Sequence, residues 1–265
     1  MLDKNILYDF INYIPYGKVV SYKKLADIFC SSPIVIAKML WEMNNIDLSS
    51  TYEIVESEGY IRKLDTKTLN LNDEGTKTYN NQIYKQHFRE PTITNYYVSL
   101  ITSDPYAIEQ FETISHKIKL LHPNHIIKTP TNYHITLADL SNTQINKELI
   151  KDIFWEINWL SPFVFQCTLH KPHIDTKKNK VIFWIRLNNN PFLITLHSCI
   201  KKHIPRRSEK IFLPHITLGK ILGTTKYNGK ILEYSLKTDC IIDRICITAN
   251  IDQKKDVVLF ERKIY

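Results

Sequence analysis

Alternating apolar and polar residues mark two similar runs in the later two-thirds of the chain. Residues 95–102 (NYYVSLIT) alternate as in a strand, a helical stretch follows from about Pro105 to Leu121, and the run closes on the strand-like NYHITLADL. The same order recurs in VIFWIRL (181–187), PFLITLHSCIKKH and IFLPHITLGK. A strand, a helix and a strand ending in HITL, used twice, predict two similar lobes that face each other.

Further strand-like stretches extend this pattern to the end of the chain. They cover residues 162–169, 239–249 and 256–264. With the two runs, they predict an α+β domain over residues 95–265, in which two pseudo-symmetric antiparallel-sheet lobes are flanked by helices.

The amino-terminal segment VVSYKKLADIFCSSPIVIAKMLWEMNN has a different pattern. It predicts a short strand and two helices, the first over Tyr22 to Cys30 with Ser21 as its cap, and the second capped by Ser32 before Pro33. This spacing is typical of a helix-turn-helix.

A polar stretch rich in Asn and Thr separates the two patterns at residues 64–94, which predicts domains of 1–90 and 95–265. The charge changes at the same place. Residues 1–94 hold 11 Lys and Arg against 12 Asp and Glu, a net charge of −1, whereas the rest hold 24 against 15, a net charge of +9. Because phosphate neutralisation supplies most sequence-independent affinity, we expect an anionic partner such as RNA to bind the second domain. The alternative is a generally basic protein without a polyanion ligand.

Composition excludes several classes of protein. The chain is 43% apolar and 23% charged, which is typical of a folded protein rather than a disordered one. No stretch approaches the roughly 18 apolar residues of a membrane span, and the start carries acids where a signal peptide carries bases, so we expect a cytoplasmic protein without a membrane partner. The cysteines lack CxxC spacing, which argues against a zinc knuckle or a disulfide framework. They are Cys30, Cys167, Cys199, Cys240 and Cys246.

The tetrapeptide His-Ile-Thr-Leu occurs twice, at His134 and at His215, in matching places of the two runs. Among ten His residues these are the two that begin a His-x-Thr pattern. In a strand, residues i and i+2 share a face, so each His points the same way as the Thr two residues on, Thr136 or Thr217. If the two lobes meet, two imidazoles and two hydroxyls converge on one cleft.

Such a constellation is suited to cleaving a phosphodiester. One imidazole removes a proton from the attacking oxygen, the other protonates the leaving oxygen, and the Thr hydroxyls bind the non-bridging oxygens. An imidazole pKa near neutrality suits both roles. The alternative is a pair of ordinary core strands with incidental histidines. No cofactor and no metal is expected.

Residues 95–265 resemble the 2H phosphoesterase superfamily, and within it the RNA 2',3'-cyclic phosphodiesterase (2'-5' RNA ligase) family. The resemblance rests on YYVSLI, NYHITLADL, VIFWIRL and PHITLGK. It implies His134 and His215 as the catalytic pair, and Thr136 and Thr217 as phosphate-binding residues. It also implies an RNA partner that carries a 2',3'-cyclic phosphate or a 2'-5' linkage. The cyclic phosphate would be opened to a 2'-phosphate, and RNA ends could be joined through a 2'-5' linkage.

The same resemblance places Lys220 where the family commonly has an Arg, and Leu213 where it often has an Arg before the Pro-His pair. One phosphate contact is therefore missing or supplied elsewhere. Our hypothesis assigns the base to His215 and the acid to His134, with the reverse assignment open. Two alternatives remain: a phosphodiesterase for small 2'-5' oligonucleotides or cyclic nucleotides, and a nucleic-acid-binding protein without turnover.

Basic residues also precede the second motif, in KKHIPRRSEK. These candidates for guiding an RNA backbone, or for a solvated loop or helix end, are Lys201, Lys202, Arg206 and Arg207. The pairs HPNH (His122, His125) and HKPH (His170, His173) have metal-ligand spacing but lack an accompanying carboxylate or Cys.

The segment IPYGKVVSYKKLADIFCSSPIVIAKML resembles the winged helix-turn-helix of O6-alkylguanine-DNA alkyltransferases and alkyltransferase-like proteins. Residues 50–53 (STYE) stand where that family has Pro-Cys-His-Arg, so alkyl transfer is excluded. Tyr22 matches the family's base-rotating Tyr, whereas its intercalating Arg falls near Asn44, and the second helix offers Lys38 against Glu42. The module is either a wing that binds DNA or structured RNA, or a docking module.

Overall fold

The chain divides into two compact units in the computed structural model. Unit 1 comprises Met1–Asn95, Ile145–Lys147 and Thr248–Phe260, and unit 2 comprises Tyr96–Gln144, Glu148–Ile247 and Glu261–Tyr265. The residues that the structure describes are 2–12, 14, 20–43, 54–55, 78–79, 82–83, 92–130, 132–141, 143–158, 163–169, 173–187, 191–204, 212–224, 238–251 and 255–264.

Unit 1 begins with three helices and short strands. These elements are α1 (Lys4–Asn12), β1 (Val20–Ser21), α2 (Tyr22–Ile28), α3 (Pro33–Met43), β2 (Ile54–Val55), β3 (Thr78–Tyr79) and β4 (Gln82–Ile83). Strand β1 pairs with β2 in parallel, and β3 pairs with β4 in antiparallel orientation. The three helices enclose a core in which Leu7, Phe10, Leu25 and Ile36 are fully buried.

Both expected helix caps are confirmed. The Ser21 hydroxyl accepts a hydrogen bond from the Lys24 amide at 3.1 Å, and the Ser32 hydroxyl accepts one from the Val35 amide at 3.3 Å. Helix α2 ends at Ile28 rather than Cys30. Cys30 itself has a φ of 47°, and a left-handed residue cannot continue a right-handed helix.

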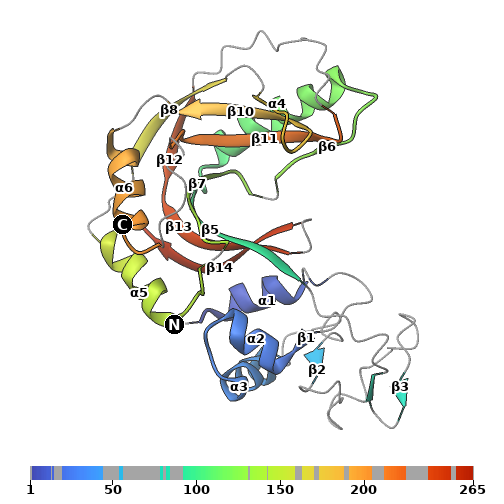
Figure 1. Ribbon diagram of the computed structural model, residues 1–265, viewed down its shortest axis with the longest axis vertical. Coiled ribbons are helices and arrows are strands. Elements are labelled where there is room, and N and C mark those ends of the chain that lie inside the picture. Colours follow the sequence, from blue (N-terminus) through green and yellow to red (C-terminus); the bar gives the residue numbers. More distant parts are fainter. Residues whose placement is uncertain are drawn as a thin grey trace. The chain divides into compact units, whose positions relative to one another are not determined.

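A large, mostly antiparallel sheet dominates the rest of the molecule (Figure 1). Its strands are β5 (Ile93–Ile101), β6 (Ile127–Lys128), β7 (His134–Asp139), β8 (Phe163–Leu169), β9 (His173–Asp175), β10 (Lys180–Leu187), β11 (His215–Leu222), β12 (Thr238–Ile242), β13 (Arg244–Ile251) and β14 (Lys255–Lys263). The order is β12-β8-β10-β11-β7-β5-β13-β14, with β6 also paired to β11 and β9 to β10. The accompanying helices are α4 (Pro105–Leu121), α5 (Lys147–Glu156) and α6 (Pro191–Lys201). The predicted α+β class is confirmed.

One predicted strand is wrong in its extent. Residues 239–249 form two strands, β12 and β13, that are separated at Asp243. The Asp243 carboxylate accepts hydrogen bonds from the Ser103 amide, at 3.0 Å, and from the Ser103 hydroxyl, and its carbonyl accepts one from the Ile264 amide at 2.8 Å. Strand β12 pairs with β8, whereas β13 lies between β5 and β14, so the chain changes its place in the sheet at Asp243.

The two strand–helix–strand runs are present, and each helix packs on the other run. The first repeat consists of β5, α4 and β7, and the second repeat consists of β10, α6 and β11. Helix α4 packs against β11, whereas α6 packs against β7. The Ser115 hydroxyl donates to the Leu218 carbonyl at 3.0 Å, and His197 Nδ1 donates to the Leu137 carbonyl at 2.5 Å. These Leu residues close the two HITL motifs, so each repeat fixes the motif of the other.

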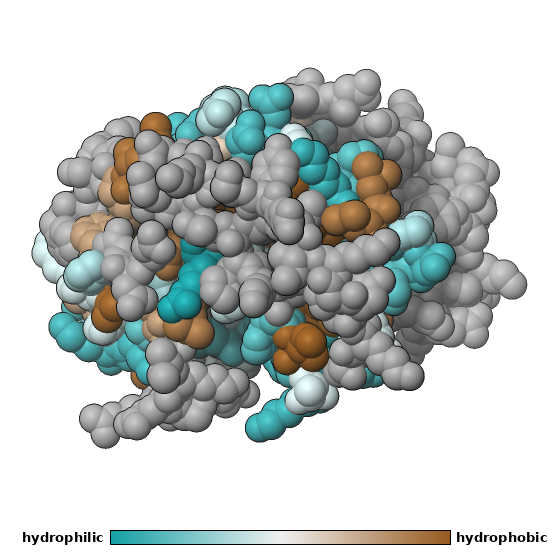
Figure 2. All heavy atoms as spheres, turned by 90° about the horizontal axis from the view of Figure 1, so that it is seen from above, coloured by the Kyte–Doolittle hydropathy of each residue, from teal (hydrophilic) through white to brown (hydrophobic). Residues whose placement is uncertain are grey.

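The described surface mixes apolar and polar side chains. Figure 2 shows hydrophobic groups interspersed with hydrophilic ones on the face seen from above. The most exposed large apolar side chains are Ile34, Leu120, Ile126 and Trp155. Among the described residues, no helix is both long and apolar enough to span a membrane.

Candidate active site

Strands β7 and β11 bring the two HITL motifs together at the middle of the sheet. Ile135 of β7 is in register with Ile216 of β11, and both side chains are buried. Residues directly opposite in a ladder point to the same face, and the neighbours of each point to the other face. His134 and Thr136 therefore share one strand face with His215 and Thr217.

The register also indicates how the four side chains are spaced. Ile135–Ile216 is the recorded pair of the two strands, and an antiparallel register extended by one residue each way would set His134 across from Thr217 and Thr136 across from His215. In such a register the two His residues would be diagonal neighbours, whose backbones are about 7–8 Å apart in a regular ladder. Two side chains on such a diagonal can reach the same phosphate group from opposite sides.

Both motif strands carry a bulge at the Leu of HITL. In the β5–β7 ladder, Val98 pairs with Ala138 and Ser99 with Thr136, so Leu137 is the extra residue. In the β10–β11 ladder, Leu218 is the extra residue, between Thr217 and Gly219. A bulge leaves its residue outside the ladder, which explains why the Leu137 and Leu218 carbonyls bond to helices instead.

Because of the bulges, the next residue after the Thr on the strand face that carries His134 and His215 is three positions further along the chain, not two. Buried positions are consecutive at Leu137 and Ala138, and again at Leu218 and Gly219. Alternation then resumes one residue late, so Asp139 joins the face of His134, and Lys220 joins the face of His215. Without its bulge, β11 would direct Gly219 to this face and Lys220 into the core.

Both imidazoles are held in the same way by the chain that precedes them. His134 Nδ1 donates to the Asn132 carbonyl at 2.9 Å, and His215 Nδ1 donates to the Leu213 carbonyl at 2.8 Å. A carbonyl only accepts, so each neutral ring carries its proton on Nδ1 and its lone pair on Nε2. In each neutral ring, Nε2 is therefore the basic nitrogen.

His215 lies in a setting that favours its neutral form. The Trp184 ring meets it edge-on, with 5.0 Å between the ring centroids. Burial lowers the pKa of His215 below its ordinary value, the Leu213 carbonyl opposes this, and the charges of Lys220 and His173 add to the lowering. Because its pKa is lowered, the His215 imidazole is unprotonated near neutral pH and is therefore available as a base.

His134 stacks on an aromatic ring from the neighbouring strand. The centroids of the Tyr97 and His134 rings are 5.1 Å apart, and the ring planes differ by 26°. Tyr97 is buried, so its ring packs against His134 and is not exposed for stacking with a nucleobase. The Tyr133 hydroxyl lies 3.1 Å from the Ser115 hydroxyl, and its ring packs edge-on against Phe111.

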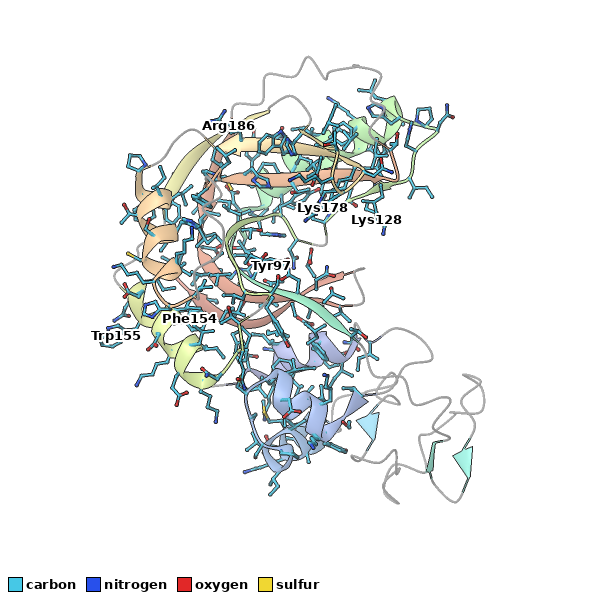
Figure 3. All side chains as sticks on the ribbon, in the orientation of Figure 1. Tyr97, Lys128, Phe154, Trp155, Lys178 and Arg186 are labelled. Atoms are coloured by element: carbon cyan, nitrogen blue, oxygen red, sulfur yellow. The ribbon has the colours of Figure 1, made fainter. Side chains whose placement is uncertain are left out.

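Arg186 is a candidate site residue that the sequence analysis missed. It is directly across from His215 in the β10–β11 ladder, on the same face, and is labelled in Figure 3. Strand β10 alternates regularly, with Ile182, Trp184 and Arg186 less buried than the residues between them. The sequence did offer one indication of Arg186: in the alternating stretch VIFWIRL, it is the charged residue at a position expected on the less buried face. Leu213, the family's expected Arg position, is exposed.

The basic residues before the second motif are only partly described. Lys201 ends α6 and Lys202 follows it, and both are exposed. Helix α6 packs against β7 through its buried Leu193 and Leu196, so these lysines belong to the helix layer. Arg206 and Arg207 lie outside the described residues, and the role of all four in RNA binding stays a prediction.

The amino-terminal candidates lie on two helices of unit 1. Tyr22 begins α2, and Lys38 is exposed on α3. Glu42, also on α3, forms an ion pair with Lys4. The positions that would test the alkyltransferase-like resemblance, Asn44 and residues 50–53, lie outside the described residues.

The His pairs with metal-ligand spacing do not assemble into a larger group in the described part of the chain. His122 is buried against Phe183, with 5.4 Å between the ring centroids, and the rings of His122 and His125 are 6.2 Å apart. No set of three or more His, Cys, Asp or Glu residues within the described ranges could hold a metal ion. His170 lies outside those ranges, and Cys30, Cys199, Cys240 and Cys246 are free thiols.

Comparisons with known proteins give remote structural likeness. No protein-family model and no curated protein matches the chain. Escherichia coli LigT complexed with NADP+ is 17% identical, with a TM-score of 0.44 over 66% of this chain and 99% of that one. TT0787 of Thermus thermophilus is 12% identical, with a TM-score of 0.46 over 64% and 97%. Kluyveromyces marxianus Usb1 is 12% identical, with a TM-score of 0.42 over 65% and 98%. The function must therefore be argued from this chain's own residues.

Proposed function

We propose that residues 95–265 form a phosphodiesterase domain that opens an RNA 2',3'-cyclic phosphate to a 2'-phosphate. The observation that supports this most directly is the pairing of Ile135 with Ile216. It gives one strand face two imidazoles and two hydroxyls, each pair from a separate copy of the same tetrapeptide. Residues 1–90 form a separate module in this proposal.

In the proposed step, His215 is the base and His134 is the acid. Nε2 of His215 removes a proton from water, whose oxygen attacks the phosphorus. The bond from phosphorus to O3' breaks, and O3' takes the proton from Nε2 of the His134 imidazolium. The products are a 2'-phosphate and a 3'-hydroxyl. Proton exchange with solvent then restores both rings, and each contributes roughly 10²- to 10⁴-fold to the rate.

The developing charge falls on the non-bridging phosphate oxygens. Thr136 and Thr217 donate their hydroxyl protons to these oxygens, while Arg186 supplies positive charge from the second repeat. Arg186 thereby replaces the contact that Leu213 cannot make. When a 5'-hydroxyl of another RNA takes the place of water, the same step forms a 2'-5' linkage.

Two other functions would use the same face differently. A phosphodiesterase for small 2'-5' oligonucleotides or cyclic nucleotides needs the same four side chains and would differ only in its substrate. A protein that binds nucleic acid without turnover needs no proton transfer, so it does not explain why both rings are held in the same tautomer.

The test is hydrolysis of a short RNA that ends in a 2',3'-cyclic phosphate. We expect the wild-type chain to release a 2'-phosphate, identified by phosphorus NMR, and His134→Ala and His215→Ala each to lose roughly 10²- to 10⁴-fold in rate. His116→Ala is the matched control, because His116 is exposed on α4.

Near-normal rates for either active-site variant would overturn the proposal, as would a 3'-phosphate product. Cleavage of 2'-5' oligoadenylate in preference to the cyclic-phosphate RNA would favour the first alternative. Binding of RNA with no turnover of either substrate would favour the second.

A further inference from the structure

Four lysines gather at one end of β10 and β11, and we call them the lysine cluster. They come from β6, β10, β11 and the turn that joins β9 to β10. The members are Lys128, Lys178, Lys180 and Lys220. Figure 3 shows Lys128 and Lys178 at one end of these strands and Arg186 at the other.

Strand register places three of these lysines on the face that carries His215. Lys220 joins that face because of the bulge at Leu218, and Lys128 is directly across from Lys220 in the β11–β6 ladder. Lys180 is in phase with Arg186 along β10, and Arg186 is directly across from His215. These three lysines and His215 therefore share one face of the sheet.

The fourth lysine is held beside the others by the turn. The Lys178 amide donates to the Asp175 carboxylate at 3.1 Å, and Lys180 Nζ lies 3.9 Å from the same carboxylate. Burial lowers the pKa of Lys180, and the charges of Lys220 and Lys178 lower it further, while Asp175 opposes them. The ammonium groups are thus close enough to repel one another.

The local charge is strongly unbalanced. Strands β6, β9, β10 and β11, with the turn at residues 176–179, contain six Lys and Arg residues and one acid, Asp175. Like charges that are brought together and partly removed from water destabilise a protein unless an anion offsets them. The arrangement is therefore suited to an anionic ligand.

The distance to the imidazole indicates how long that ligand is. Lys220 lies five residues beyond His215 on β11, which is about 16 Å at the usual rise per residue. One phosphate group cannot reach both positions. A short single strand of RNA can, because its backbone carries a phosphate at every nucleotide and is readily followed by a row of cations.

The first repeat offers no comparable row. Asp139 occupies the place in β7 that Lys220 has in β11, and Tyr97 is the residue across from it. Strand β5 contains no Lys or Arg, and β7 contains none either. Among the described central strands of the two repeats, the positive charge that attracts a polyanion therefore lies on β10 and β11.

We propose that the lysine cluster binds the backbone phosphates of a single-stranded oligoribonucleotide whose cyclic-phosphate end lies between His134 and His215. This inference rests on the proposed function. A terminal cyclic phosphate has RNA only on its 5' side, so the bound phosphates belong to the nucleotides that precede the end. The domain is then an enzyme for oligonucleotides rather than for free cyclic mononucleotides.

The experiment compares two substrates and two exposed lysines. Kinetics are measured with adenosine 2',3'-cyclic phosphate and with a pentaribonucleotide that ends in the same group, for the wild type and for Lys128→Gln/Lys178→Gln. Lys151→Gln, on the exposed side of α5, is the matched control. Thermal unfolding verifies that all variants are folded.

We expect the double variant to raise KM several-fold for the pentanucleotide, with kcat unchanged, and to leave both constants unchanged for the mononucleotide. The dependence of log affinity on log salt should become shallower by about 0.7 for each phosphate that is no longer neutralised. An equal change for both substrates, no change for either, or the same change in Lys151→Gln would overturn the inference.

A binding measurement separates this inference from the proposed function. Fluorescence anisotropy follows a labelled pentanucleotide with a 2'-phosphate end bound to His215→Ala, with and without the two lysine substitutions. If no substrate is turned over but the substitutions weaken salt-sensitive binding, the cluster stands and the proposed chemistry fails. If turnover is normal and binding is unaffected, the proposed chemistry stands and the cluster fails.

Discussion

The two repeats have the same backbone plan but carry different charges. Each presents a His and a Thr from an HITL motif, a bulge at the Leu, and a carbonyl taken by a helix of the other repeat. The second repeat adds Arg186 and Lys220, where the first has Ile101 and Asp139. Proton transfer by two His residues requires similar backbone geometry in both repeats. Binding a polymer that extends in one direction requires different charges on the two repeats. The two repeats have both properties.

The repeats also differ at the residue after the bulge. Ala138 follows Leu137 in the first, and Gly219 follows Leu218 in the second. A Cβ at Gly219 would lie 2.8 Å from the Ile127 Cγ2 atom, because β6 packs there. Glycine therefore allows the extra strand that brings Lys128 to the surface of the second repeat.

The largest expected difference concerns the two Thr hydroxyls. Thr136→Val and Thr217→Val should each lower kcat on a cyclic-phosphate RNA, by up to about 10²- to 10³-fold. Thr136→Val should lose more, because Arg186 lies on the side of Thr217 and still holds the phosphate oxygen. Thr195→Val, exposed on α6, is the control. Equal losses, or a greater loss at Thr217, would contradict the division of charge between the repeats.

A smaller effect is expected from exchanging the residues that follow the bulges. Gly219→Ala should destabilise the fold by roughly 1–3 kcal/mol, because the Ile127 methyl has to move. Ala138→Gly should cost about 0.5–1 kcal/mol, as expected for glycine in a strand. Urea unfolding of both variants measures the difference. If Gly219→Ala is the milder change, the close approach of β6 does not explain the glycine.

The smallest expected effect is on pH dependence. The pKa of His215 is lowered, so the base stays neutral below the ordinary imidazole value of 6.5, and activity is lost only as pH falls through the lowered value. Lys220→Gln removes a positive charge that disfavours the imidazolium, so the pKa rises and the acid limb of kcat/KM moves to higher pH. Lys151→Gln should leave the limb in place. A shift of the limb to lower pH would mean that the acid limb reports a different group.

Much of the fold was predictable because its strands alternate cleanly. The alternation in HITL was enough to place each imidazole with a hydroxyl, and Ser21 and Ser32 were recognisable as helix caps. The bulges were not predicted, since Leu-Ala and Leu-Gly are both apolar and either residue could pair. Arg186 was missed for a related reason, because only the register across two strands shows that it faces His215. The break at Asp243 depends on Ser103, which is far away in sequence.

The crossed hydrogen bonds from Ser115 and His197 mean that neither repeat is complete by itself. If one repeat were expressed alone, the Leu carbonyl at its bulge would lack the helix residue that donates to it, and the sheet face that this helix covers would be exposed. Two identical halves could satisfy each other by exchanging helices about a twofold axis. Such a pair would make the same crossed hydrogen bonds that the two repeats make within one chain.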